Sequence, residues 1–296
     1  MQSVLAKASK ADIVTEPFPH IVIENALEPD LYEQLASEFP GVDFFFDNEQ
    51  QIANTKALLT GPESLASPHA SPLWKDFITY HMSADFYREV AALFGDLLRE
   101  YYPTLEQVLG KPLEEMTVGP RKDAFKVPSL KHPYDVMLDC QPFVDYTFTE
   151  RKFRGPHVDS GCEFYAGLLY MREAEDESTG GSLGIWRAKD EAWTFPAPHT
   201  VRYDDGAKGP APERLDLVAE VPYRTNCFVM FLNSWRSLHC AQARSASLLP
   251  RRAVNIIGEI CRFHEPSLFQ VERPGGSKEK PRPGFARRAL SRLRQI

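Results

Sequence analysis

Hydrophobic patterns typical of helices and of strands occupy different parts of this chain. Between positions 113 and 263, short apolar or alternating runs are separated by turn residues, as a barrel or sandwich of strands requires. Before position 113 the pattern predicts a strand at 18–24, a helix from Glu28 to about Phe39 and a short helix at about 104–109. The strongest helical pattern runs from Ser83 to about Tyr101, with apolar residues at Phe86, Val90, Leu93, Phe94, Leu97 and Leu98. The chain is therefore expected to form a mainly β core supported by N-terminal helices.

Segments without a clear period are expected to be irregular. Residues 1–16 are interpreted as a frayed leader. Residues 40–75 are interpreted as an irregular stretch whose Phe44, Phe45 and Phe46 pack in the core or line a substrate cleft. The segment 187–220 contains several prolines and an Asp-Asp-Gly turn, and is interpreted as an inserted loop or lid beside the mouth of the barrel.

The formal charge of −7 is unevenly distributed along the chain. Residues 273–296 contain eight Lys or Arg and one Glu, a charge of +7, so residues 1–272 carry −14. A body this acidic is a poor general binder of nucleic acid, because phosphate contacts need clustered Lys and Arg. The basic tail has apolar residues on one helical face, and is expected either to lie on an anionic membrane surface or to remain solvated.

Cysteine usage and hydropathy point to a reducing compartment. The chain has five cysteines without a C-x-x-C pair, which fits reduced thiols better than a disulfide framework. It has no apolar run of 18 residues and no apolar stretch near Met1 that resembles a signal peptide. We expect a cytoplasmic protein, with peripheral contact to the inner membrane surface through the tail as an alternative.

The pattern with the most specific chemistry is His157-Val158-Asp159 together with His239. On a strand, residues i and i+2 point to the same side, so His157 and Asp159 can reach one ion while Val158 faces away. Two imidazoles and one carboxylate occupy one face of an octahedral metal and suit non-haem Fe(II) with open positions. Taken alone, the pattern is equally what unrelated core or surface histidines produce in a chain with eight of them.

Arg251 is the second candidate group, twelve residues after His239 in a run that is predicted to be a strand. Iron of this kind needs an electron source for O₂, and a 2-oxo acid that chelates the metal can supply it. A dicarboxylic 2-oxo acid needs a cation for its far carboxylate, and a guanidinium binds a carboxylate through two parallel hydrogen bonds. Arg252 is expected to point to the other face of the strand.

Six short motifs occur in a fixed order between about Asp139 and Ile260, and this stretch resembles the Fe(II)/2-oxoglutarate-dependent dioxygenases. The resemblance is closest to their prolyl-hydroxylase-like branch, including the hypoxia-sensing type. The motifs are Pro156-His157-Val158-Asp159, Leu168-Leu169-Tyr170-Met171, Gly180-Gly181-Ser182-Leu183-Gly184-Ile185-Trp186, Asn226-Cys227-Phe228-Val229-Met230-Phe231, Ser237-Leu238-His239 and Arg251-Arg252-Ala253-Val254.

The resemblance implies a role for each matching residue. His157, Asp159 and His239 would be both metal ligands and catalytic residues, and Arg251 would bind 2-oxoglutarate. Tyr170 falls where a tyrosine hydroxyl often contacts the same carboxylate, and Asn255 where a polar residue assists. The implied reaction consumes 2-oxoglutarate and O₂, releases succinate and CO₂ and hydroxylates an unactivated C–H, with ascorbate as an optional reductant. Halogenating relatives lack the carboxylate, so Asp159 favours hydroxylation.

The resemblance also implies the fold and its boundaries. We expect a double-stranded β-helix, the cupin-like jelly roll, in one oxygenase domain over 1–272. Its N-terminal strand and helical support would occupy 1–112, its jelly-roll core about 113–264, and the basic tail 273–296. The link from His239 to Arg251 is stretched by Ala246–Leu249, which leaves Arg252 or Arg244 as alternatives for the clamp.

Two other functional classes stay open at this point. One is a jelly-roll protein that binds a metal or ligand without catalysis. The other is a metal-dependent isomerase or hydrolase on the same roll, which would need no Arg251 and would tolerate Zn²⁺. The substrate is also open among a peptidyl residue, a small metabolite and an envelope glycoconjugate or lipid conjugate. Arg154 and Arg236 flank the ligands as candidates for an anionic substrate.

Overall fold

The computed structural model describes residues 1–46, 55–121, 134–149, 155–159, 162–189, 200–202, 208–210 and 212–260. Its helices are α1 (Pro29–Ser37), α2 (Val42–Phe45), α3 (Gly61–Ala66), α4 (Pro72–His81), α5 (Ala84–Tyr101) and α6 (Leu105–Leu109), with 3-10 turns at Lys10–Asp12, Leu113–Glu115 and Pro212–Arg214. Its strands are β1 (His20–Glu24), β2 (Lys56–Leu58), β3 (Val118–Pro120), β4 (Val136–Asp145), β5 (Glu163–Tyr170), β6 (Leu183–Ala188), β7 (Thr200–Arg202), β8 (Lys208–Pro210), β9 (Leu215–Val221), β10 (Cys227–Leu232), β11 (His239–Ala241) and β12 (Arg251–Ile260).

The strands form two main sheets that the chain visits in turn. The large sheet has the order β1-β10-β5-β12-β4-β2, with β3 beside β4, and the small sheet has the order β11-β6-β9. The backbone of His157 adds a bridge to His239 at the β11 edge of the small sheet. From β4 the chain passes to that bridge, returns to β5, crosses to β6 and β9, and repeats the alternation through β10, β11 and β12. This alternation is the topology of a double-stranded β-helix, which confirms the predicted fold.

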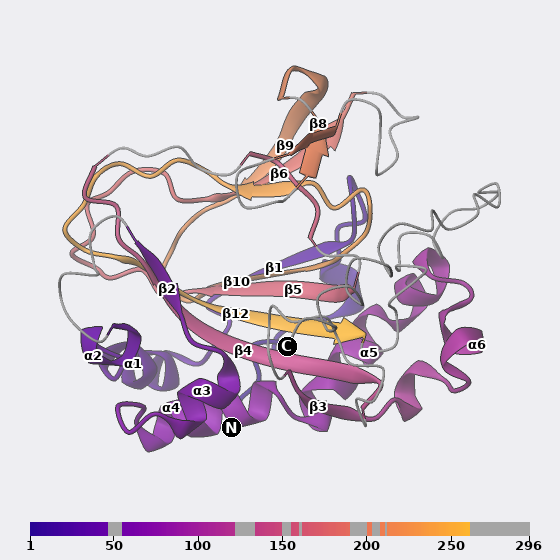
Figure 1. Ribbon diagram of the computed structural model, residues 1–296, viewed down its shortest axis with the longest axis horizontal. Coiled ribbons are helices and arrows are strands. Elements are labelled where there is room, and N and C mark those ends of the chain that lie inside the picture. Colours follow the sequence, from indigo (N-terminus) through magenta and orange to yellow (C-terminus); the bar gives the residue numbers. More distant parts are fainter. Residues whose placement is uncertain are drawn as a thin grey trace, which may run out of the picture.

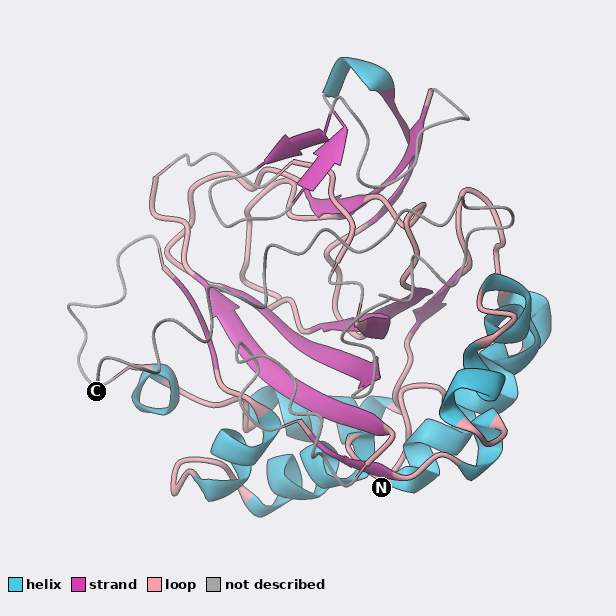
Figure 2. Ribbon diagram, turned by 45° about the vertical axis from the view of Figure 1, so that its right-hand side comes forward, coloured by secondary structure: helices cyan, strands magenta, loops and turns pink. Residues whose placement is uncertain are grey.

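The helices cover one face of the large sheet, and the small sheet lies on the opposite side (Figures 1 and 2). α5 shows why its sequence forms a helix that docks there. The side chain of Ser83 accepts a hydrogen bond from the backbone N–H of Phe86 and so caps its first turn. Its buried residues, which include Val90, Phe94 and Leu98, recur at helical spacing and join the core formed by the helices and the outer face of the sheet.

β4 is buried on both faces, and its alternating residues face two different environments. On β4, Val136, Leu138 and Cys140 pack against the helices, and the intervening residues face the inside of the roll. A second apolar cluster lies between the sheets and includes Phe143 and Tyr223. The inner face therefore offers both the polar and the aromatic groups from which a site can be built.

The N-terminal half departs from the sequence prediction in two places. Residues 1–16 are not a frayed leader, because Val4 and Leu5 are buried in the core and the backbone N–H of Val4 donates to His81 Nε2. Residues 40–75 are not irregular throughout, because α2, α3, β2 and the start of α4 lie there. The local signals that were missed are caps: Thr60 and Ser71 accept hydrogen bonds from Glu63 N and Trp74 N, and a proline follows in the first turn of each helix.

The segment 187–220 is also more regular than an inserted loop. β6 continues to Ala188, and β9 pairs with it antiparallel as a strand of the small sheet. β7 and β8 form a separate two-stranded sheet. The basic tail 273–296 lies outside the described residues. None of the described helices is both long and apolar enough to cross a bilayer.

Candidate active site

The two candidate histidine ligands are brought together by a backbone bridge. The N–H of His157 donates to the carbonyl of His239 at 3.1 Å, and the N–H of His239 donates to the carbonyl of His157 at 3.0 Å. Residues paired directly across an antiparallel bridge place their side chains on the same face. The two imidazole rings accordingly lie with their centroids 4.7 Å apart, although 82 positions separate them in the sequence.

Each imidazole is oriented by a carbonyl behind it. Nδ1 of His157 lies 2.9 Å from the carbonyl oxygen of Gly155, and Nδ1 of His239 lies 2.8 Å from that of Ser237. A carbonyl oxygen only accepts, so Nδ1 of each neutral ring must carry the proton. Nε2 then keeps its lone pair, and this is the arrangement by which proteins prepare histidine for a metal.

Asp159 completes the group. Its two carboxylate oxygens lie 3.7 Å from His157 Nε2 and 3.4 Å from His239 Nε2. Ligand atoms on one face of an octahedron, with bonds of about 2.1 Å, would be about 3.0 Å apart, so the carboxylate and the two imidazoles would draw closer together around an ion. Across the described part of the chain, this is the one His/Cys/Asp/Glu group whose ligand atoms converge within 4.8 Å.

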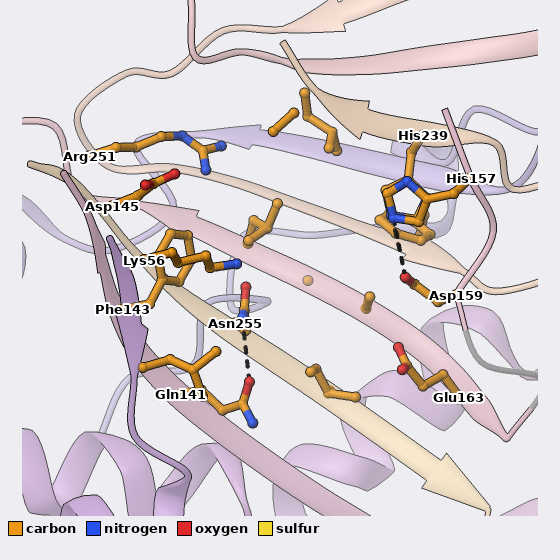
Figure 3. A pocket seen from close by; sticks show the side chains of 18 of the residues that line it. Lys56, Gln141, Phe143, Asp145, His157, Asp159, Glu163, His239, Arg251 and Asn255 are labelled. Carbon is orange, nitrogen blue, oxygen red and sulfur yellow. Dashed lines mark hydrogen bonds and ion pairs between the residues drawn. The ribbon is translucent and has the colours of Figure 1, made fainter. Parts of the chain in front are cut away.

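The triad lines one end of a cavity of about 490 Å³, and Arg251 lines the other end (Figure 3). β12 explains how one strand spans the distance: Arg251, Asn255 and Ile257 alternate onto its inner face and all line the cavity. Arg251 is 5% exposed. Its Nε donates to the carbonyl of Gly181 at 3.1 Å, and its Nη2 donates to the hydroxyl of Tyr170 at 3.1 Å.

The two arginines that were alternatives to Arg251 do not line the cavity. Arg252 points to the helix side of the sheet, where its guanidinium lies over the ring of Phe39 and forms an ion pair with Glu173 at 2.5 Å. Arg244 is buried in an ion pair with Asp176 at 2.9 Å and also donates to the carbonyl of Leu249. Both guanidinium groups are therefore held by groups outside the cavity.

Tyr170 and Asn255 have different surroundings. Tyr170 is fully buried, contacts Arg251 and does not line the cavity. Asn255 lines the cavity wall between the two ends, and its Nδ2 donates to Gln141 Oε1 at 3.4 Å (Figure 3). Gln141 Nε2 in turn donates to Asp139 Oδ2 at 2.7 Å. Since Asp139 accepts, this chain of amides directs the carbonyl oxygen of Asn255 towards the cavity.

The cavity also holds charged residues that the sequence did not single out. Lys56, Arg121, Asp145 and Glu163 line it together with Gln141. Behind the wall, Arg121 pairs with Glu259 at 2.5 Å and lies 3.9 Å from Asp139. Burial raises the pKa of Asp139 to about 6 and raises that of Glu259 as well, with Arg121 opposing both shifts. These residues come from five different segments, so no local spacing marks them.

Three further residues with histidine, cysteine or arginine side chains are described by the structure. His20 is buried, with its Nδ1 at 2.8 Å from the carbonyl oxygen of Phe18. Cys162 is partly exposed and is not a member of the metal group. The guanidinium of Arg236 lies over the ring of Trp235. Arg154 is outside the described residues.

No protein-family model and no curated protein matches the chain. Among solved structures, it is similar to a prolyl 4-hydroxylase from Pseudomonas putida, with 14% identity, a TM-score of 0.40, and 87% of this chain and 100% of that chain covered. It is also similar to a prolyl 4-hydroxylase from Phytophthora capsici, with 14% identity, a TM-score of 0.44, and 83% of this chain and 60% of that chain covered. A third similar structure is an oxidoreductase of the 2OG-Fe(II) oxygenase family from Burkholderia pseudomallei, with 9% identity, a TM-score of 0.37, and 82% of this chain and 87% of that chain covered.

These solved structures carry names from the family that the sequence resembles. At identities of 14% or less and TM-scores below 0.5, they support no statement about reaction or substrate.

Proposed function

We propose that the protein is an Fe(II)- and 2-oxoglutarate-dependent dioxygenase that hydroxylates an unactivated C–H of an organic substrate. One observation supports this proposal above the others. The His157, Asp159 and His239 group and the buried guanidinium of Arg251 lie at opposite ends of the same cavity. A ligand with a metal-chelating head and a distal carboxylate matches both ends.

His157, Asp159 and His239 would hold the metal and leave the opposite face open to the cavity. The bound iron would supply the O₂ activation and the C–H oxidation that protein side chains do not perform. Gly155 and Ser237 keep the two imidazoles in the tautomer with a free Nε2. Arg251 would bind the distal carboxylate of 2-oxoglutarate, and Tyr170 would hold the guanidinium in place. Asn255 would present its carbonyl oxygen between the two ends.

The test of the proposal is cosubstrate turnover. Purified protein with Fe(II), ascorbate, O₂ and 2-oxoglutarate should form succinate at a slow rate in the absence of organic substrate. Omission of O₂ or replacement of Fe(II) by Zn(II) should stop succinate formation. A protein that binds Fe(II) and 2-oxoglutarate but forms no succinate would be the non-catalytic binding protein. Turnover of an organic substrate with Zn(II) alone would indicate an isomerase or hydrolase.

The substrate, the compartment and the role of the tail belong to the same proposal. A peptidyl residue, a small metabolite and an envelope glycoconjugate are distinguished as substrates by adding candidates of each class to this assay and measuring the succinate formed above the uncoupled rate.

Deletion of residues 273–296 should leave Fe(II) binding and uncoupled succinate formation unchanged, because no proposed ligand lies beyond Asn255.

A further inference from the structure

Tyr223 lies in the loop between β9 and β10, and three arginine side chains lie close to its ring. It is 2% exposed. The guanidinium carbons of Arg172 and Arg251 lie 5.5 Å from the centre of its ring, and that of Arg244 lies 6.0 Å away. Each of these distances is within the range in which a cation is attracted to the negative face of an aromatic ring.

The three arginines differ in how their charges are balanced. Arg172 Nε lies 3.7 Å and Arg244 Nη2 lies 2.9 Å from Oδ2 of the buried Asp176. Arg251 has no ion pair within the part of the chain that the structure describes. The unpaired arginine is thus the one that lines the cavity.

A buried guanidinium requires compensation, because removing a charge from water is costly. Asp145 is paired with Arg251 across β4 and β12 and lies beside it in Figure 3, whereas the groups that accept hydrogen bonds from the guanidinium, the Gly181 carbonyl and the Tyr170 hydroxyl, are neutral. The guanidinium carbon of Arg251 lies 5.0 Å from the ring centre of Tyr170, 5.5 Å from that of Tyr223 and 5.8 Å from that of Phe143. Burial raises the pKa of the Tyr223 hydroxyl to about 12, so this ring stays neutral at ordinary pH. We call Tyr170, Tyr223 and Phe143 the aromatic cage.

Tyr223 also fixes the backbone from which Arg251 extends. Its hydroxyl accepts a hydrogen bond from the N–H of Arg252 at 2.9 Å. Its ring packs edge-to-face on Tyr170, with centroids 5.4 Å apart and planes at 87°. One side chain therefore contacts the guanidinium of Arg251, the start of β12 and the residue that hydrogen-bonds Arg251.

From this geometry we infer that Tyr223 is a positioning residue for distal-carboxylate recognition: it holds Arg251 oriented for an anion entering the cavity. The inference rests on the proposed function, since 2-oxoglutarate is taken as the anion.

The inference is tested by two ligands that share the metal end and differ at the other end. Oxalate chelates a metal and is too short to reach Arg251 as well, whereas 2-oxoglutarate spans both ends. Both are titrated anaerobically into the Fe(II)-loaded, full-length wild type and the variants Tyr223→Leu and Tyr223→Phe. Tyr32→Leu is the matched control, because it removes a buried tyrosine from the other face of the large sheet. Should Tyr223→Leu not fold, Tyr223→Met offers a longer and more adaptable apolar side chain without an aromatic face.

Tyr223→Leu is expected to weaken 2-oxoglutarate binding about fivefold or more while oxalate binding stays within about twofold of wild type. Tyr223→Phe keeps the ring and should retain most of the affinity, and Tyr32→Leu should match wild type for both ligands. Unchanged 2-oxoglutarate affinity in Tyr223→Leu, or equal loss for both ligands, overturns the inference and leaves the proposed function standing. Failure of the wild type to bind 2-oxoglutarate overturns both.

Discussion

The two ends of the cavity prepare their functional groups in opposite ways. At the metal end, backbone carbonyls orient the rings of His157 and His239, and Asp159 supplies a carboxylate. At the clamp end, neutral oxygens and aromatic rings contact Arg251, and Asp145 lies beside it (Figure 3). We propose that the metal end receives a cation and that the clamp end receives an anion. The difference teaches that backbone carbonyls orient the groups at one end and aromatic rings orient the group at the other.

Loss of the metal end should have the largest effect. His157→Ala, Asp159→Ala and His239→Ala each remove one of three protein ligands, so each is expected to lower succinate formation at least about a hundredfold. The fold should persist, because the backbone bridge between 157 and 239 uses no side-chain atoms. Succinate formation and thermal unfolding are measured together. Near wild-type turnover in any one variant would remove that residue from the ligand set.

Loss of the charge at the clamp end should have the next largest effect. Arg251→Ala is expected to raise the 2-oxoglutarate requirement at least about tenfold, because a charge-assisted contact is worth roughly 1.5–3 kcal/mol. Arg251→Lys should recover only part of this, since an ammonium lacks the planar fork. Arg252→Ala is the control, because it points to the helix side. A larger loss of 2-oxoglutarate affinity in Arg252→Ala than in Arg251→Ala would show that Arg251 is not the clamp residue.

The Gly180-Gly181 turn sharpens the comparison, because it supplies a neutral acceptor to Arg251. Gly181 has φ +76° and its carbonyl accepts from Arg251 Nε. A Cβ at 181 would meet no atom closer than 3.4 Å, so Gly181→Ala introduces backbone strain alone, about 1–2 kcal/mol. At 180 the Cβ would lie 2.0 Å from the carbonyl oxygen of Ala243. Unfolding should therefore show a larger loss of stability for Gly180→Ala, whereas 2-oxoglutarate affinity should fall a few-fold in Gly181→Ala. Equal stabilities would contradict this account.

The smallest effect concerns the wall between the ends. Burial raises the folded-state pKa of Asp139 to about 6 from an ordinary value of 3.8. The unfolded state therefore releases this proton at lower pH, and the contribution of Asp139 to stability falls as pH rises from about 4 to 6. Asp139→Asn removes that titration, so its stability relative to wild type should rise across this window. Denaturant unfolding of both proteins at pH 4, 5, 6 and 7 measures it, and a constant difference would refute the assignment.

The metal end could be predicted from the sequence and most of the clamp end could not, for a physical reason. His157 and Asp159 lie two residues apart because neighbouring same-side positions on an extended strand can reach one ion, so their spacing is visible in the chain. Arg251 was found through its distance from His239 and the family resemblance. The rings of Phe143 and Tyr223 come from separate segments that meet only in the folded roll, and each reads as an ordinary core aromatic.

The fold shows the same division. The long amphipathic α5 and the strands of the core were predicted, because their periods are sustained. α4 was missed because it begins inside a stretch rich in prolines and polar residues, where its start is marked by the short capping signal of Ser71. β9 was taken for part of a loop because five consecutive residues, 216–220, are exposed and its partner β6 lies 27 or more positions earlier. Pairing across that distance leaves no local signature.

The central claim is that the two ends serve one ligand, and it is tested most directly by linkage. 2-Oxoglutarate is titrated anaerobically into wild-type protein with and without Fe(II), and Fe(II) is titrated with and without 2-oxoglutarate. The account predicts one 2-oxoglutarate per chain, with Fe(II) raising its affinity at least about tenfold and 2-oxoglutarate raising the Fe(II) affinity by the same factor. Affinities that are independent of one another would contradict it, because the metal end and Arg251 would then bind separate molecules.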